Sequence, residues 1–192
     1  MSARREQILT TAARLFAVRG FHGVSVAEIG AACGMSGPGI YKHFTSKDAL
    51  LAEMLVDISE QLLSVGQDRV AGADGPAAAL GALVDWHVDF ALHHPDLIVV
   101  QDRDWASLPD EARERVRLLQ RSYVDLWADQ LRDLDPTRVP DRASGRARAH
   151  ATFGLLNSTP HSNLLPEQDM RAVLREMALA GLGVTDALPA AG

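Results

Sequence analysis

Apolar residues recur at intervals of three and four along almost the whole chain, and this spacing is the strongest constraint on its fold. The first segment shows it at Ile8, Leu9, Ala12, Leu15 and Phe16, which places these side chains on one face of a helix. Val, Ile, Thr and aromatic residues nowhere alternate with polar residues over a long stretch, so strands are not expected. The pattern predicts an all-α protein of about nine helices.

Glycine, proline and capping residues divide this pattern into helices and loops. We expect helices over residues 3–19, 26–33, 37–44, 47–65, 77–93, 109–134, 142–158 and 166–182, with a short segment over 96–105. The stretch 66–76 is rich in Gly, Ala and Asp and is expected to be a loop. Pro160 is expected to follow the end of the eighth helix, with a polar loop after it.

The segment 26–44 is typical of two short helices joined by a tight turn. Ser25 and Glu28 have the spacing of a capping box, which opens the first of these helices. Gly34 ends that helix, and Ser36 caps the next one with Pro38 in its first turn. The arrangement matches a helix-turn-helix, although a plain packing corner has the same local pattern.

Charge is distributed unevenly along the chain. Residues 1–48 hold six basic and three acidic side chains, whereas residues 49–192 hold 13 basic and 22 acidic ones, and the whole chain has a net charge of −6. A short basic head on an acidic body directs a polyanion to one end. Charge alone leaves random scatter open as the alternative.

The string FHGVSVAEIGAACGMSGPGIYKHFTSKDAL, residues 21–50, carries the helix-turn-helix pattern with its flanking positions. Together with the preceding helix, it closely resembles the DNA-binding signature of TetR-type repressors over about residues 4–55. The resemblance implies a three-helix DNA-binding domain at 1–46 and a larger helical domain for effector binding and dimerisation at 47–192. It further implies a ligand-responsive transcriptional regulator, which we expect to be a repressor released from a palindromic operator by a small hydrophobic or aromatic effector.

In that family the short helix at 37–43 enters the major groove. The resemblance implies DNA contacts from Ser25, Val26, Ser36, Gly37, Pro38, Gly39, Tyr41, Lys42, His43 and Lys47. Ile29, Ile40, Phe44 and Leu50 are expected in the core. Gly37 and Gly39 depart from the polar side chains that many relatives have here, so base discrimination would depend on Lys42, backbone fit and DNA shape. Arg4 and Arg5 allow two interpretations: they form an arm near the DNA backbone or minor groove, or they belong to a frayed, solvated terminus.

Two recognition helices about 34–36 Å apart are needed to read a palindrome, which calls for a homodimer. The family usually pairs its last two long helices for this purpose. The apolar or small residues expected at the dimer interface are Ala147, Ala151, Gly154, Leu155, Met170, Val173, Met177, Ala180 and Gly181. Packing of the same faces inside one subunit is the alternative.

The middle helices contain most of the aromatic residues and are expected to enclose the effector. Candidate ligand-binding residues are Trp86, Phe90, Trp105, Tyr123, Trp127, Phe153, Asn157 and His161, with His87 as a further polar group. Each aromatic residue is by itself as well explained by core packing, but the set fits an apolar or aromatic ligand. Acyl chains, including acyl thioesters, and aromatic metabolites both remain open.

Motifs of other protein classes are not found. The sequence has no G-x-S-x-G elbow, P-loop or H-E-x-x-H motif, and its seven histidines lack metal-ligand spacing, so no enzyme activity, cofactor or metal site is expected. A helical protein-interaction module without DNA is the remaining rival. One cysteine, no signal peptide and no long apolar run predict a cytoplasmic protein without a membrane span.

Overall fold

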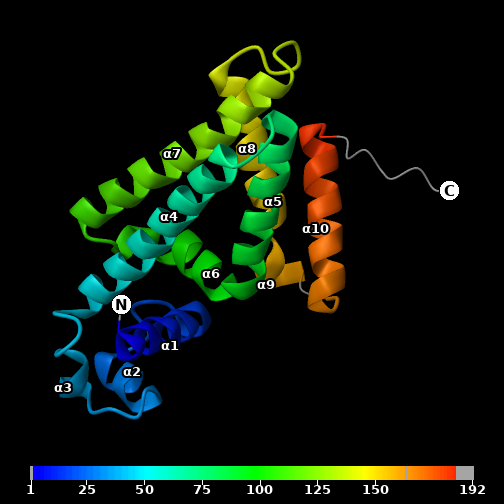
Figure 1. Ribbon diagram of the computed structural model, residues 1–192. Helices are drawn as coiled ribbons and strands as arrows, with labels where there is room; N and C mark the ends of the chain where they lie inside the picture. The colour runs from blue at the N-terminus through cyan, green and yellow to red at the C-terminus, as the bar shows by residue number, and fades with distance from the viewer. Residues whose placement is uncertain (1, 163, 185–192) are drawn as a thin grey trace. The chain divides into compact units, whose positions relative to one another are not determined.

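The structure is a computed structural model that describes residues 2–162 and 164–184. In these residues the chain forms ten α-helices and one 3-10 turn, with no strand, which confirms the all-α prediction (Figure 1). The helices are α1 (Ala3–Arg19), α2 (Val26–Ala32), α3 (Gly37–Ile40), α4 (Lys47–Ala71), α5 (Pro76–His93), α6 (Pro95–Asp104), α7 (Asp110–Leu134), α8 (Arg142–Leu156), α9 (Thr159–Ser162) and α10 (Glu167–Leu182), and the 3-10 turn η1 is Trp105–Ser107.

The chain forms two compact units. Among the described residues, the first unit comprises 2–60 and Asp96–Leu118, and the second comprises Gln61–Pro95, 119–162 and 164–184. Helices α4 and α7 therefore each begin in the first unit and end in the second. The predicted functional boundary between residues 46 and 47 remains a prediction, because a compact unit is defined by packing and not by role.

The first unit is built around the apolar faces of α1, α2 and the start of α4. Ile8, Phe16, Ile29 and Leu51 are fully buried at its centre. The same core contains Ile40, Phe44 and Leu50, which confirms their predicted burial. Val100, Leu108 and Val116 also belong to it, so α6 and the start of α7 complete the core of this unit.

The second unit is a helical layer in which α10 packs against both α5 and α8 (Figure 1). Its core is aliphatic along α5 and α10, with Leu80, Leu83 and Leu174 buried. Trp127 of α7 is the largest fully buried side chain among the described residues. Burial of these apolar side chains is the dominant favourable contribution to the folding of such a unit.

The predicted loop over 66–76 is wrong in its first half, because α4 continues to Ala71. Gly66, the first residue of this stretch, is buried in the interior of α4. A Cβ atom at this position would lie 2.8 Å from Cε2 of Tyr123 and 3.3 Å from side-chain atoms of Leu126 and Leu83. The glycine therefore allows close packing and does not end the helix, and only the tertiary contacts reveal this.

The polar loop expected after the eighth helix is also wrong in part, because Thr159–Ser162 form the short helix α9. Pro160 is in the first turn of α9, where its missing N–H has no cost. The hydroxyl of Thr159 donates a hydrogen bond to the Ala91 carbonyl at 2.7 Å, and Thr159 is 2% exposed. This contact holds α9 on the end of α5.

No helix within residues 2–162 and 164–184 combines the length and the hydropathy that a membrane span requires.

Candidate nucleic-acid interface and effector site

Small residues let the two helices of the helix-turn-helix cross closely. A Cβ on Gly30 would lie 3.1 Å from the main-chain carbonyl group of Ser36, and one on Gly37 would lie 3.3 Å from Cα of Ala27. Gly34 in the turn has φ +67°, which favours glycine. Gly37 therefore has a packing role that is separate from its predicted contact with DNA.

The recognition helix α3 is shorter than the expected 37–44. It spans Gly37–Ile40. The N–H groups of His43 and Phe44 then donate to the Ile40 carbonyl at 2.8 and 3.0 Å, so a hydrogen-bonded turn follows the helix. Two glycines in four residues lower helix propensity, which explains why the regular helix ends early. Tyr41 and Lys42 lie in this turn.

The capping box at the start of α2 is present as predicted. The Ser25 hydroxyl accepts from the Glu28 N–H at 3.2 Å and donates to the Glu28 carboxylate at 2.7 Å, while the Ser25 N–H donates to that carboxylate at 2.8 Å. These bonds from Ser25, with a further one from Arg19, lower the pKa of Glu28 to about 2. Ser25 is thus already hydrogen-bonded within the protein, and a contact from Ser25 or Val26 to phosphate remains a prediction.

The exposed side chains of the recognition segment are few. Tyr41 is 55% exposed, Pro38 and Lys42 are exposed, and His43 is half-buried. Ser36 is exposed and makes no side-chain capping hydrogen bond, so its hydroxyl is not used at the start of α3. The surface that this segment offers comprises the Tyr41 phenol, the Lys42 ammonium, the Ser36 hydroxyl and a small apolar patch at Pro38.

Lys47 is bound inside the unit. Its ammonium donates to the carbonyls of Phe21 and Val24 at 2.8 and 2.9 Å and lies 4.3 Å from the centre of the Phe21 ring. These contacts hold the loop before α2 against the start of α4. The predicted phosphate contact of Lys47 is not tested, but two of its three donor hydrogens are already directed at the protein.

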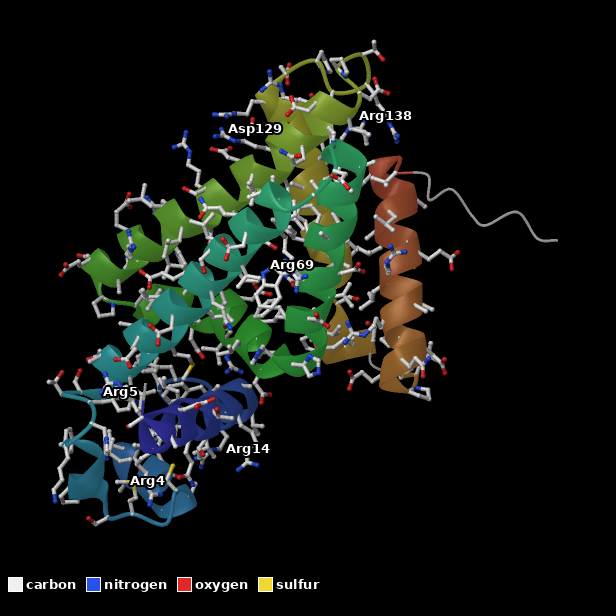
Figure 2. The ribbon with its side chains drawn as sticks, viewed as in Figure 1. Arg4, Arg5, Arg14, Arg69, Asp129 and Arg138 are labelled. Carbon is white, nitrogen blue, oxygen red and sulfur yellow. The ribbon has the colours of Figure 1, made fainter. Side chains whose placement is uncertain are left out.

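Arg4 and Arg5 belong to α1 and do not form a free arm. Figure 2 shows them leaving α1 in different directions, Arg4 toward α2 and Arg5 toward the start of α4. Arg5 forms an ion pair with Glu53, donates to the His43 carbonyl and lies 4.3 Å from the centre of the Phe44 ring. Arg5 therefore connects α1, the end of the recognition segment and α4, so the frayed-terminus interpretation is wrong. A place near the DNA backbone remains untested.

The end of α6 is attached to the loop that precedes the helix-turn-helix. The buried Asp104 carboxylate accepts a hydrogen bond from the Phe21 N–H at 3.2 Å. Arg103 donates to the carbonyls of Phe16 and Ala17, the latter at 3.0 Å. The sequence analysis did not identify Arg103 or Asp104. Neighbouring Arg and Asp residues at the end of a predicted helix are usually exposed, and no nearby sequence pattern indicates that this pair binds another segment.

In the second unit, four of the predicted ligand-binding residues meet in one cluster with His87. Tyr123, Trp127, Phe153 and Asn157 surround His87, which is 3% exposed. The rings of His87, Tyr123 and Phe153 are nearly parallel, and the Trp127 ring is nearly perpendicular to them. We name these five residues the His87 cluster. Phe90 contacts His87 edge-on at 5.5 Å.

Burial of the His87 cluster shifts the pKa values of its two titratable groups, His87 and Tyr123. Burial lowers the pKa of His87 to about 4, against a smaller upward effect of its hydrogen bond with Asn157. Burial also raises the pKa of the Tyr123 hydroxyl. Both groups are therefore neutral at pH 7, and the cluster offers uncharged hydrogen-bonding atoms among aromatic surfaces.

Three other candidate residues lie outside this cluster. Trp105 belongs to the core of the first unit, His161 is exposed on α9, and the Trp86 N–H donates to the Leu62 carbonyl at 3.2 Å. The spacing of aromatic residues along each helix does not show which of them pack in the same core. That depends on which helices the fold brings together. Their predicted ligand contacts remain untested.

The predicted dimer face is largely exposed on α8 and α10. Met177 is 53% and Val173 38% exposed, and Ala147, Ala151, Gly154, Ala180 and Gly181 are exposed too. Ala151, Leu155, Met177 and Gly181 line a depression of about 210 Å³ together with Arg148, Thr152 and Ala178. Met170 is the exception: it is 6% exposed and belongs to the core of the second unit, so its predicted place at the interface has no support from exposure and remains a prediction.

Within the part of the chain that the structure describes, no group of three or more His, Cys, Asp or Glu side chains is placed to hold a metal ion.

Two family profiles match the chain. The profile described as "Bacterial regulatory proteins, tetR family" matches residues 8–54, and the one described as "Tetracyclin repressor-like, C-terminal domain" matches residues 73–161. Together they cover the helix-turn-helix and most of the second unit. The fold and both matches define a helix-turn-helix regulator.

The chain belongs to the TetR family of bacterial regulators. It is 29% identical to the HTH-type transcriptional repressor KstR2 of Rhodococcus jostii RHA1 over 66% of this chain and 62% of that protein. In fold it is similar to a TetR-family regulator from Bordetella parapertussis 12822, with TM-score 0.83, 24% identity and coverage of 97% and 100% of the two chains. It is also similar to AibR, solved with isovaleryl coenzyme A and operator DNA, with TM-score 0.73, 23% identity and coverage of 91% and 97%.

Proposed function

We propose that this protein is a dimeric, ligand-responsive repressor that binds a palindromic operator through Gly37–Ile40 and the turn after it. The observation that carries the proposal is the helix-turn-helix itself, with Tyr41 and Lys42 exposed on a segment whose apolar side is buried. Proteins that read the major groove present such a segment on a rigid support. Its place of action would be the cytoplasm, where a bacterial chromosome lies.

Dimerisation is supported by the apolar face on α8 and α10. Small residues on this face would let two copies approach closely, and Met177 would fill the space between them. An exposed face of this composition is unusual in a monomer and favours an interface.

Effector binding is supported by the His87 cluster, which places polar atoms among aromatic rings. A ligand releases DNA only when it binds the DNA-incompetent conformation more tightly than the competent one. AibR, named above, was solved with both an acyl thioester and DNA. By analogy, we propose an apolar effector that changes the position of the DNA-binding helices through α4 or α6.

The proposal is tested by fluorescence anisotropy with DNA from upstream of the protein's own gene. We expect saturable binding that weakens steeply as salt rises. Tyr41→Phe and Lys42→Met should weaken binding, whereas Thr10→Ala, an exposed change on α1, should not. Failure of the protein to bind any such DNA better than random duplex at low salt would refute the function.

A further inference from the structure

The indole N–H of Trp127 is buried in the His87 cluster without a hydrogen bond of normal geometry. Trp127 is 0% exposed, and its Nε1 atom has no partner within hydrogen-bond criteria. The Tyr123 hydroxyl lies one helical turn earlier on the same helix. Burial raises the pKa of this hydroxyl, and a weaker interaction with the Trp127 side chain lowers it. Native proteins rarely leave a buried N–H without a hydrogen-bond acceptor. We therefore expect a bound molecule to provide one for Trp127.

The Tyr123 hydroxyl is a second loosely bound donor. Its oxygen is 3.4 Å from Nδ1 of His87, which is long for a hydrogen bond between these atoms. His87 Nε2 is 3.0 Å from the Asn157 amide oxygen, which only accepts, so Nε2 carries the ring hydrogen. In the neutral ring Nδ1 is then an acceptor, and Tyr123 donates toward it.

We propose that the Trp127 N–H and the Tyr123 O–H together bind the carbonyl oxygen of an uncharged, mainly apolar effector. The hydrogen of the Tyr123 hydroxyl can rotate away from Nδ1 of His87, to which its bond is long. The cluster would then offer two donors to one acceptor atom of a ligand. None of the five residues of the cluster is a cation, so a carboxylate placed here would be buried without a counter-charge, which is strongly unfavourable. This inference rests on the proposed ligand-responsive function and assigns the chemical class of its effector.

Phe153 occupies the place that the apolar body of such a ligand would take. Its ring is parallel to His87 at 4.7 Å and to Tyr123 at 5.5 Å, and it meets Trp127 edge-on at 5.1 Å. Phe153 is half-buried, whereas His87, Tyr123 and Trp127 are buried. A ligand would therefore enter this cluster only after the Phe153 ring rotates, and the rings of His87 and Tyr123 that Phe153 now covers would then stack on a phenyl ring or a comparable hydrophobic group.

The test compares three probes of similar apolar size by calorimetry on the full-length protein. Hexanophenone carries a carbonyl, hexylbenzene is the corresponding hydrocarbon, and 6-phenylhexanoate carries a charge. We expect hexanophenone to bind on the order of tenfold more tightly than hexylbenzene, because only the ketone can accept the two neutral hydrogen bonds, each of modest net strength. Phenylhexanoate should bind more weakly than the ketone. Equal affinities for the ketone and the hydrocarbon would overturn the proposal.

Variants assign the effect to the two donors. Trp127→Phe and Tyr123→Phe should each reduce the preference for the ketone. Ser64→Ala, which removes an exposed hydroxyl on α4, should leave the preference unchanged. Phe153→Ala should raise the affinity for hexanophenone by supplying the space in advance. A ketone preference that survives in both Trp127→Phe and Tyr123→Phe would contradict the assignment.

Proton–nitrogen NMR of the indole groups provides a readout that does not depend on how the variants fold. The chain has three tryptophans, and the signal missing in Trp127→Phe, or shifted in Tyr123→Phe, belongs to Trp127. This signal should move downfield with hexanophenone and not with hexylbenzene. An unmoved signal at saturating ketone would refute the contact.

DNA release separates this inference from the proposed function. If hexanophenone binds through Trp127 but leaves DNA affinity unchanged, the carbonyl site stands and the ligand-responsive function fails. If ketone and hydrocarbon bind alike while a different class of compound releases DNA, the function stands and the carbonyl inference fails.

Discussion

Lys47 holds the loop before α2 through the carbonyls of Phe21 and Val24. Lys47→Met keeps a long side chain but removes the ammonium, so both carbonyls lose a donor. We expect the free energy of unfolding to fall by about 1–2 kcal/mol. Urea denaturation followed by circular dichroism measures this change.

Lys42→Met is the matched control for Lys47→Met, because Lys42 is exposed on the recognition segment. Its stability should stay within about 0.5 kcal/mol of the wild type. Its DNA affinity should fall, and the slope of log affinity against log salt should decrease by about one if it meets a phosphate. Full stability with loss of DNA affinity in Lys47→Met would instead assign Lys47 to the DNA.

The lowered pKa of the buried His87 predicts that the free energy of unfolding depends on pH. Its pKa is about 4 in the folded protein and near 6.5 when unfolded, so between these values only the unfolded chain binds the proton. The free energy of unfolding therefore decreases as the pH falls from 6.5 to 4, by about 3 kcal/mol at 1.36 kcal/mol per pKa unit. Above pH 6.5 this contribution is complete.

The His87 prediction is checked by denaturation at a series of pH values. His87→Gln should lose this part of the pH dependence, whereas His161→Gln, an exposed change, should keep it. Parallel curves for the wild type and His87→Gln would show that the folded protein protonates this ring normally.

At the scale of elements, α4 illustrates how a glycine can strengthen a helix contact. Ala usually stabilises a helix interior relative to Gly by about 0.5–1 kcal/mol. At Gly66, however, the new Cβ would lie 2.8 Å from the buried Tyr123 ring. We expect Gly66→Ala to lower the free energy of unfolding by about 1–3 kcal/mol through overpacking.

The control for Gly66→Ala is Gly81→Ala, in the interior of α5. A Cβ at Gly81 would meet no atom within 4 Å. This variant should therefore gain about 0.5–1 kcal/mol in thermal or urea denaturation. If both variants gained stability, the close packing of α4 against Tyr123 would not hold in solution.

At the scale of the whole molecule, the exposed apolar face on α8 and α10 predicts a dimer. Met177→Glu places a charge on this face, where burial in an interface would be unfavourable. We expect this variant to sediment as a monomer and to lose most of its operator affinity, because two recognition segments are needed for one palindrome.

Leu118→Glu is the matched control for Met177→Glu. Leu118 is 51% exposed, close to the 53% of Met177, but it belongs to α7. Analytical ultracentrifugation should find Leu118→Glu in the same state as the wild type. A dimer that persists in Met177→Glu would place the interface elsewhere.

Local sequence patterns determined the helices, the capping box of Ser25 and Glu28, and the burial of Ile29, Ile40 and Phe44. These features depend on hydrogen bonds and periodicities within a few residues, which the sequence displays directly. The continuation of α4 past Gly66, the attachment of Lys47, Arg5 and Asp104, and the burial of Met170 were decided only by the tertiary structure. Each depends on atoms brought together from distant parts of the chain, and no local pattern encodes that meeting. The same reason separates Trp127, which joins His87, from Trp105, which packs in the other unit.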